Sequence, residues 1–227
     1  VPTPVAVPTP VAPAPPVKAP PPVAQPAPQP VAPAAPVVGA VNPDDAPSAV
    51  AKSGKVARST NPDEPPAFGP KDAKVHVIIF SDFQCPVCRR AKEATHQIAE
   101  EFPGEVRLEF WQHALKMHRN AERSALASLA AHRQGKFWEY HDILFANQSG
   151  LDDLSLATYA QQAGLDMAKF NKDIADPALK AMMDKQGAFA EAMGARGTPA
   201  SFVNGKYVKG AKPLDGMTAE VEAALAA

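Results

Sequence analysis

One stretch of the chain, residues 75–88, restricts the fold more than any other. Residues 75–80 form a β-branched, apolar run of the length of a strand. A few residues later, the sequence Cys-Pro-Val-Cys at 85–88 opens a pattern with helical spacing. Proline suits the first position of a helix because the N–H that it lacks would be unpaired there. These are the only two cysteines of the chain, and their place at a strand-to-helix turn favours a reversible dithiol/disulfide pair.

Two other roles for Cys85 and Cys88 stay open at this point. A permanent structural disulfide would close a very short loop, which restricts the unfolded chain little. A zinc site would require about four ligands, and the chain offers only these two thiols and six scattered histidines. We therefore predict neither a metal nor another cofactor.

The prolines divide the chain into a tail and one domain. Residues 1–47 hold 17 of the 26 prolines, among small residues such as valine and alanine. This composition predicts a disordered tether biased towards polyproline II, which at about 3.1 Å per residue could reach on the order of 100 Å. A docking site for a proline-binding partner is the alternative. Because the sequence does not begin with methionine, we expect that a secretion signal, with or without an anchor, preceded it.

The remaining residues, 48–227, predict a single α/β domain. A strand, a helix and a strand come first, then about seventy helical residues, then a hairpin and a last helix. So long a helical stretch exceeds one crossover, so we interpret residues 118–194 as an inserted helical subdomain. Asn204-Gly205 is a strong signal for a two-residue hairpin turn. The predicted strands are 74–80, 105–111, 200–203 and 206–208, with a short edge strand within 56–59; the predicted helices are 86–101, 120–134, 136–145, 154–163, 167–174, 177–193 and 214–226.

Charge and hydropathy exclude several classes of protein. The net charge is −1, and no run of eighteen apolar residues suggests a membrane-spanning helix. There is no glycine-rich phosphate loop and no excess of basic residues. We expect no nucleic-acid partner, and we expect a monomer.

This order of elements resembles the thioredoxin fold (βαβ…ββα) and, more narrowly, the DsbA-like thiol:disulfide oxidoreductases of bacterial envelopes, which carry a helical insert. The resemblance spans roughly residues 70–227. Its matching segments are Phe80-Ser81-Asp82-Phe83-Gln84-Cys85-Pro86-Val87-Cys88, His118-Arg119-Asn120-Ala121, Gln134-Gly135-Lys136-Phe137-Trp138 with His141-Asp142 and Leu144-Phe145, and Arg196-Gly197-Thr198-Pro199 with Phe202 and Asn204-Gly205.

The chemistry of the pair follows from its place at a helix start. Unpaired N–H groups and the helix dipole favour negative charge on Cys85, so it is expected to be the acidic, more exposed nucleophile. Cys88 lies one turn further on and is expected to resolve the mixed disulfide. Pro86 and Val87 complete the motif, and Val87 adds neither a donor nor a charge. We predict a reduction potential between roughly −270 and −120 mV, the thioredoxin and DsbA extremes.

The resemblance implies two further features. Thr198-Pro199 is expected to form a cis-proline loop beside the disulfide, where the Thr198 backbone would bind an extended substrate segment as an added strand. Many relatives carry an acidic residue six positions before the first cysteine, which exchanges protons with the second thiol. Ile79 occupies that position here, so Cys88 must use another group or water.

Other polar and aromatic residues near the motif are interpreted as structural. Asp82 is expected to shape the turn, and Arg89 and Arg90 to lie on a solvated helix face. The histidines are expected to be surface or packing residues, although His118 has a place near the substrate groove as an alternative. Four aromatic residues are expected to form the core of the insert: Phe137, Trp138, Tyr140 and Phe145.

We therefore expect a periplasmic or cell-envelope oxidase that introduces disulfides into unfolded or reduced exported proteins. The resemblance implies reoxidation by a membrane quinone-linked partner. A disulfide isomerase or reductase is the alternative, although those isomerases usually dimerise through a folded N-terminal domain that a proline-rich segment cannot supply. A non-catalytic, tethered peptide-binding module is an alternative of another class.

Overall fold

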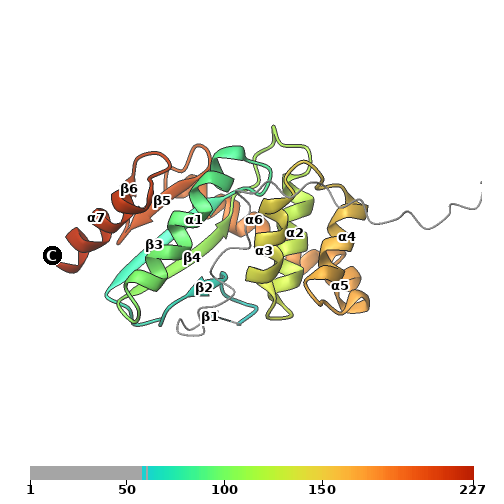
Figure 1. Cartoon of the computed structure of the whole chain (residues 1–227). Helices are drawn as coiled ribbons and strands as arrows, with labels where there is room; N and C mark the ends of the chain where they lie inside the picture. Colours follow the sequence, from blue (N-terminus) through green and yellow to red (C-terminus); the bar gives the residue numbers. More distant parts are fainter. Residues whose placement is uncertain (1–57, 60) are drawn as a thin grey trace, which may run out of the picture. The chain divides into compact units, whose positions relative to one another are not determined.

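The computed structural model describes residues 58–59 and 61–227, and Figure 1 shows how their elements are arranged. These residues make up most of the predicted domain, residues 48–227. The predicted tether, residues 1–47, and any signal or anchor before it lie outside the described residues.

Within the described residues, six strands form one sheet in the order β1-β2-β4-β3-β5-β6. The predicted βαβ unit is confirmed: β3 and β4 pair in parallel, and α1 (Pro86–Glu101) connects them. The other neighbouring strands pair antiparallel. The strands are β1 (Arg58–Ser59), β2 (Ala67–Phe68), β3 (Val75–Ser81), β4 (Val106–Gln112), β5 (Ala200–Val203) and β6 (Lys206–Val208).

The central strand β3 is covered on both faces, as its apolar sequence predicts. Val75, Val77 and Ile79 belong to the large core that includes residues of α1 and α7 (Leu214–Leu225). Phe80 and the partly buried Ile78 instead pack with residues of α6 (Pro177–Ala192). The period of two along β3 thus divides the core into two layers, and Figure 1 shows α1 in front of the sheet.

The helical insert is confirmed as five helices between β4 and β5. In Figure 1, four of them, α2 to α5, lie at one end of the sheet, and α6 packs against its second face. Three of them begin at an aspartate whose carboxylate accepts a backbone N–H of the first turn: Asp152, Asp166 and Asp176. The four aromatic residues expected in its core are buried. The helices are α2 (Ala121–His132), α3 (Phe137–Ala146), α4 (Asp153–Gln162), α5 (Met167–Ile174) and α6.

The hairpin between β5 and β6 turns where the sequence predicts. Asn204 and Gly205 have φ of +45° and +79°, the left-handed conformation that a two-residue hairpin turn of this type requires. The Asn204 side chain also binds the neighbouring strand, since its Oδ1 accepts the N–H of His76 at 2.8 Å. The turn residue therefore also fixes the end of β5 against β3.

Strand β2 is the element that the sequence analysis missed. It has only two residues, too few to show alternation, and it lies between Pro66 and Gly69 in a stretch interpreted as turns. It pairs with β4, and the ring of Phe68 stacks on Trp138 with centroids 4.0 Å apart. The short strand thereby joins the sheet to the insert.

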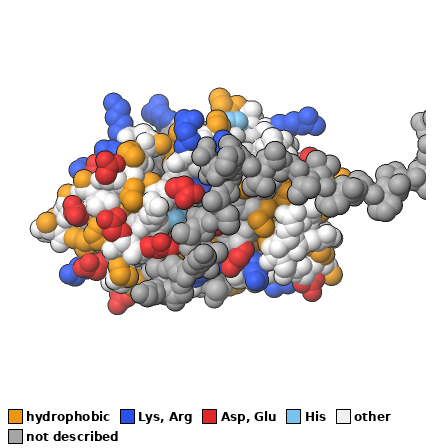
Figure 2. Space-filling view, viewed as in Figure 1, with side chains coloured by type: hydrophobic (Ala, Val, Ile, Leu, Met, Phe, Trp, Pro, Cys, Tyr) orange, Lys and Arg blue, Asp and Glu red, His pale blue; other side chains and the backbone are white. Residues whose placement is uncertain are grey.

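Surface charge on the domain is mixed. Figure 2 shows acidic and basic side chains on the same face, so neither sign covers it. In the part of the chain that the structure describes, no helix combines the length and the apolar character needed to cross a membrane.

Candidate active site

Cys85 is the N-cap residue of α1, and Pro86 is the first residue of the helix, as the sequence predicts. The N–H groups of Cys88 and Arg89 donate to the Cys85 carbonyl at 3.1 and 3.3 Å, which starts the helix at this residue. No side chain caps this terminus. The first-turn N–H groups thus surround the cysteine sulfur, where they favour a thiolate.

Both thiols are reduced, and both are buried. The exposed fraction is 5% for Cys85 and 2% for Cys88, so Cys85 is the more exposed of the two, as expected, although both are buried. The Thr198 loop lies against it, since the Cys85 thiol donates to the Thr198 carbonyl at 3.3 Å. A substrate must reach the sulfur past this loop.

The acidity of Cys85 is strongly increased. Hydrogen bonding from the Cys88 thiol is the largest cause, and the Thr198 side chain and the N–H groups of Cys88 and Val87 add to it. Together they outweigh the opposing effect of burial and lower the pKa of Cys85 to about 5. Cys85 is therefore a thiolate at neutral pH, the form that attacks disulfides.

Cys88 has the opposite environment. Burial, and then its interaction with the Cys85 sulfur, raise the pKa of the Cys88 thiol far above that of a free cysteine, with only partial opposition from Ser81. Cys88 thus keeps its proton while Cys85 is charged. One ionised and one protonated sulfur are what a nucleophile and a resolving thiol require.

The expected cis-proline loop is present, since the Thr198-Pro199 peptide bond is cis. The hydroxyl of Thr198 is buried and has no partner among the described residues, so it can donate to the Cys85 sulfur once that sulfur is charged. The structure thus brings Thr198 together with both cysteines, although they lie more than a hundred residues apart.

Asp82 shapes the turn before the motif, as expected, and it also binds a second loop. Its side chain is fully buried, and Oδ1 accepts the N–H of Gln84 at 2.7 Å. Oδ2 accepts the N–H of Leu115 at 2.9 Å and lies 2.8 Å from Nδ1 of His118. His118 therefore acts on the site through Asp82, by holding the loop after β4 against the motif.

Gln148 is a site residue that the sequence analysis missed. Its amide nitrogen donates to the carbonyls of Phe83 and Cys85 at 2.7 and 2.9 Å, so the insert fixes the backbone of the motif. Gln148 lies more than sixty residues from the motif and matches no chemical motif, so no signal in this single sequence pointed to it. Arg89 and Arg90 are exposed, as expected for a solvated helix face.

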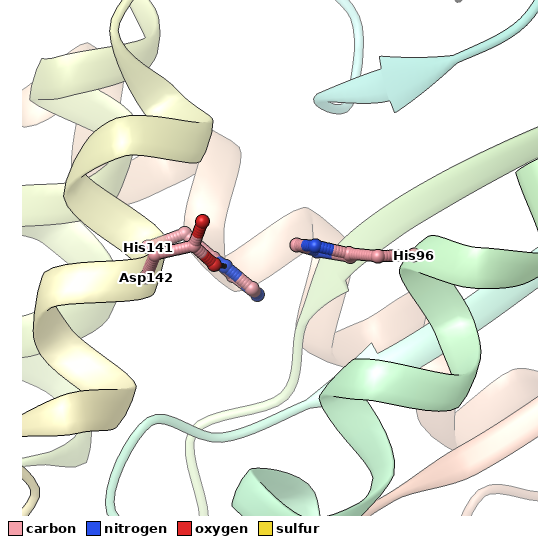
Figure 3. Close-up of side chains that lie close together, drawn as sticks. All are labelled: His96, His141 and Asp142. Atoms are coloured by element: carbon pink, nitrogen blue, oxygen red, sulfur yellow. Dashed lines mark hydrogen bonds and ion pairs between the residues drawn. The ribbon is translucent and has the colours of Figure 1, made fainter. Parts of the chain in front are cut away.

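The described residues contain one group with metal-ligand side chains, His96, His141 and Asp142, which Figure 3 shows between α1 and α3. All three are within reach of a common point, with ligand atoms within 4.8 Å of one another. However, Nδ1 of His141 is bound to Asp142 at 3.0 Å, and the two imidazoles stack with centroids 4.9 Å apart and planes inclined by 28°. Lone pairs in nearly parallel ring planes do not converge on one ion, so this geometry does not suit a metal.

Comparison with protein families gives a match over most of the chain. The family model described as thioredoxin matches residues 60–223. Among curated proteins, the Na(+)/H(+) antiporter NhaA 1 of Salinispora arenicola is 35% identical over 161 residues, which is 69% of this chain. The match covers only 24% of the antiporter, so most of that protein has no counterpart in this chain.

Solved structures with the same fold cover the domain almost completely. A thioredoxin-like oxidoreductase from Silicibacter pomeroyi DSS-3 is 28% identical, with a TM-score of 0.66 over 74% of this chain and 95% of that chain. A periplasmic thioredoxin-like protein from Salmonella enterica serovar Typhimurium is 23% identical, with a TM-score of 0.64 over 74% of this chain and 92% of that chain. The latter likeness concerns the fold alone.

Proposed function

This chain belongs to the thioredoxin family, and on that premise we propose that it is a protein thiol:disulfide oxidoreductase that works as an oxidase. The observation that carries the proposal is the contrast between the two sulfurs. The pKa of Cys85 is lowered to about 5, whereas burial raises that of Cys88. A stabilised Cys85 thiolate favours the reduced enzyme, which makes its disulfide a good oxidant.

The reaction exchanges disulfides without a cofactor. A substrate thiolate attacks Cys85 in the Cys85–Cys88 disulfide, and Cys88 leaves and takes up a proton. A second substrate thiolate then attacks the substrate sulfur of the mixed disulfide, and Cys85 leaves as a thiolate. Its low pKa makes Cys85 a fast leaving group in this last step. The substrate gains a disulfide, and the enzyme retains the two electrons as a dithiol.

Substrate would bind as an extended segment along the Thr198 backbone. Beside this loop lies a surface groove of about 530 Å³, whose lining includes Leu115, Glu191 and Arg196. Both signs of charge and an apolar side chain line the groove, which suits unfolded chains of varied sequence. Main-chain pairing supplies affinity with little demand on that sequence.

A place outside the cytosol fits this activity, because disulfides persist there. The partners would be reduced exported proteins and a membrane quinone-linked reoxidant, and the enzyme would act as a monomer on its N-terminal tether.

The direct test is single-turnover oxidation of a peptide with two cysteines by the oxidised full-length protein. We expect the wild type to form the peptide disulfide as its own is lost. Cys85→Ser and Cys88→Ser should form none, because neither variant can hold the Cys85–Cys88 disulfide that takes up the two electrons. A peptide-binding module would instead bind the peptide equally well with Cys85→Ser and would not oxidise it.

Thiol trapping in cells separates the oxidase from the isomerase or reductase alternative. We expect the Cys85/Cys88 pair to be mostly oxidised in the cell. A mostly reduced pair would favour the isomerase or reductase, as would a reduction potential near the thioredoxin value of roughly −270 mV.

A further inference from the structure

The resolving cysteine has a proton that no acidic side chain of its surroundings can take. Cys88 is 2% exposed, and Ile79, six positions before Cys85, is apolar. Ile79 and Cys88 line a common cavity, here called the Cys88 cavity. Its other polar lining residues are Ser81, Lys92, Thr95 and His141, and none of them is acidic.

The Cys88 cavity has room for one water molecule. The volume of the cavity is about 10 Å³, close to the minimum that one water molecule requires. Such a water needs two to four polar partners, and the thiol, hydroxyl and imidazole groups of the lining supply them. A proton can therefore cross this cavity over a single water.

Of the ionisable side chains that line the cavity, only His141 can accept a proton from Cys88. The ammonium of Lys92 has no lone pair and lies 3.7 Å from the Glu93 carboxylate. The Asp142 carboxylate binds Nδ1 of His141 at 3.0 Å, so this nitrogen carries the ring proton. The lone pair is then on Nε2 of a ring that lines the cavity.

The surroundings keep His141 neutral and fixed in orientation. Burial lowers its pKa against the opposing effect of Asp142, and Lys92 adds to the lowering while Glu93 opposes it. The remaining ionisable neighbour is His96, stacked on the ring; its pKa is lowered to about 3, mainly by burial. Aromatic rings surround the imidazole, with centroids 4.8–5.7 Å from its own: Phe83, Phe110, Phe137, Trp138 and Phe145.

We propose that His141, oriented by Asp142, exchanges the proton of Cys88 through a water in the Cys88 cavity. This inference rests on the proposed oxidoreductase function and assigns its proton acceptor. Asp142 is a positioning residue, and its carboxylate stabilises the imidazolium form of His141. The Asp142 side chain is 27% exposed, so it connects His141 with solvent.

Atoms and electrons balance when a mixed disulfide on Cys85 is resolved. The proton of Cys88 passes through water to Nε2 of His141, and the Cys88 thiolate attacks the Cys85 sulfur. The bond from Cys85 to the substrate sulfur breaks, the Cys85–Cys88 bond forms, and the substrate leaves as a thiolate. The enzyme dithiol loses two electrons and the substrate disulfide gains them. When Cys88 is the leaving group, the proton returns along the same route.

The test follows the reaction of the reduced full-length protein with 5,5′-dithiobis(2-nitrobenzoate) by stopped flow. The first released chromophore reports attack by Cys85, and the second reports resolution by Cys88. With His141→Gln we expect an unchanged first phase and a second phase slowed at least tenfold, since general base catalysis contributes about 10²–10⁴-fold. The pH dependence of the second phase should also change, from a plateau above the pKa of His141 to a rate that rises with hydroxide concentration.

Two further variants separate proton transfer from packing. Adding Ile79→Glu to His141→Gln should restore the second phase, because it places a carboxylate on the same cavity. His96→Phe is the matched control. It removes a buried imidazole that stacks on His141 but does not line the cavity, and whose nitrogens have no hydrogen-bond partner among the described residues. It should leave both phases unchanged.

The outcomes that contradict the proposal are distinct. A second phase that keeps its rate and pH dependence in His141→Gln overturns it, and so does a slowed phase that Ile79→Glu does not restore. If His141→Gln also loses the first phase, the same measurement is made on Asp142→Asn, which keeps the imidazole. A slower second phase in Asp142→Asn supports the proposal, and an unchanged second phase overturns it. A wild type without any first phase would instead refute the oxidoreductase function itself.

Discussion

The thiol of Cys88 is the largest single cause of the low pKa of Cys85, so the two residues cannot be treated separately. We expect Cys88→Ala to raise the pKa of Cys85 towards the free value of about 8.5, because the donor is removed. Cys88→Ser is the matched control: its hydroxyl still donates, so the pKa should remain closer to that of the wild type. Rates of alkylation by iodoacetamide across a pH series measure both, and equal midpoints for the two variants would contradict the assigned cause.

Single residues differ in how far the sequence reveals them. Cys85 could be recognised as the nucleophile because its environment, the start of α1, is local in sequence. Gln148 and His141 could not be placed near the cysteines, because each reaches the site from α3 or the loop that follows it, and residue spacing does not encode that contact. The burial of Cys85 could not be predicted for the same reason, since the distant Thr198 loop lies against it.

At the scale of the elements, Asp82 joins the end of β3 to the loop after β4. Its buried carboxylate accepts two backbone N–H groups and contacts His118, so Asp82→Ala leaves those groups without a partner. We expect a loss of about 2–4 kcal/mol in the free energy of unfolding, measured with urea.

The control for Asp82 is Asp184→Ala, which removes an exposed carboxylate paired with Lys180 on the surface of α6. It should change the free energy of unfolding by no more than about 0.5 kcal/mol. Equal losses for the two variants would mean that Asp82 does not connect the two segments.

The pairing of β2 with β4 depends on Gly69. Its φ is +84°, and a Cβ atom there would lie 2.0 Å from the Val106 carbonyl oxygen. We expect Gly69→Ala to lower the free energy of unfolding by about 3 kcal/mol or more, through backbone displacement. Gly104 has the same φ of +84° but no atom within 4 Å of the Cβ position, so Gly104→Ala should cost only about 1 kcal/mol. Comparable urea midpoints for the two variants would contradict the close approach.

Strongly periodic elements could be predicted from the sequence almost residue by residue. Helix α1 and strands β5 and β6 have the predicted bounds, because proline, glycine and the Asn204-Gly205 turn mark their ends. Strand β2 has no such marker: its two residues pair with β4 where Phe68 packs on Trp138, about seventy residues away in the sequence. Its existence therefore depends on tertiary packing.

At the scale of the whole molecule, the opposite shifts of the two thiols make the stability of the reduced protein depend on pH. For Cys85, the folded pKa of about 5 lies below the ordinary value of about 8.5, so its stabilisation is complete above about pH 8.5 and is lost as the pH falls towards 5. For Cys88, the folded pKa is raised, so its contribution is complete below about pH 9 and is lost above it.

We therefore expect the reduced protein, relative to the oxidised one, to gain stability from pH 5 towards pH 9 and to lose it above. Urea unfolding of both redox forms of the wild type across this range measures the difference. Cys85→Ser, which has no disulfide form, should show no gain in stability between pH 5 and pH 9. A difference that stays constant with pH would contradict unequal acidities.

The sequence predicts the order of elements, the parallel βαβ unit and the helical insert, because the hydrophobic period and the turn residues indicate each of them. The arrangement of the insert against the sheet was not, since it depends on buried contacts between residues far apart, such as those of Asp82 with Leu115 and His118.

The most direct test of the low pKa of Cys85 is a titration of thiolate absorbance in the ultraviolet on the reduced wild-type protein. We predict one transition with its midpoint near pH 5, from Cys85, and no second thiolate up to about pH 9, because burial keeps Cys88 protonated. A first midpoint near 8.5, the value of an unperturbed cysteine, would contradict the claim that the head of α1 and the Cys88 thiol hold Cys85 ionised.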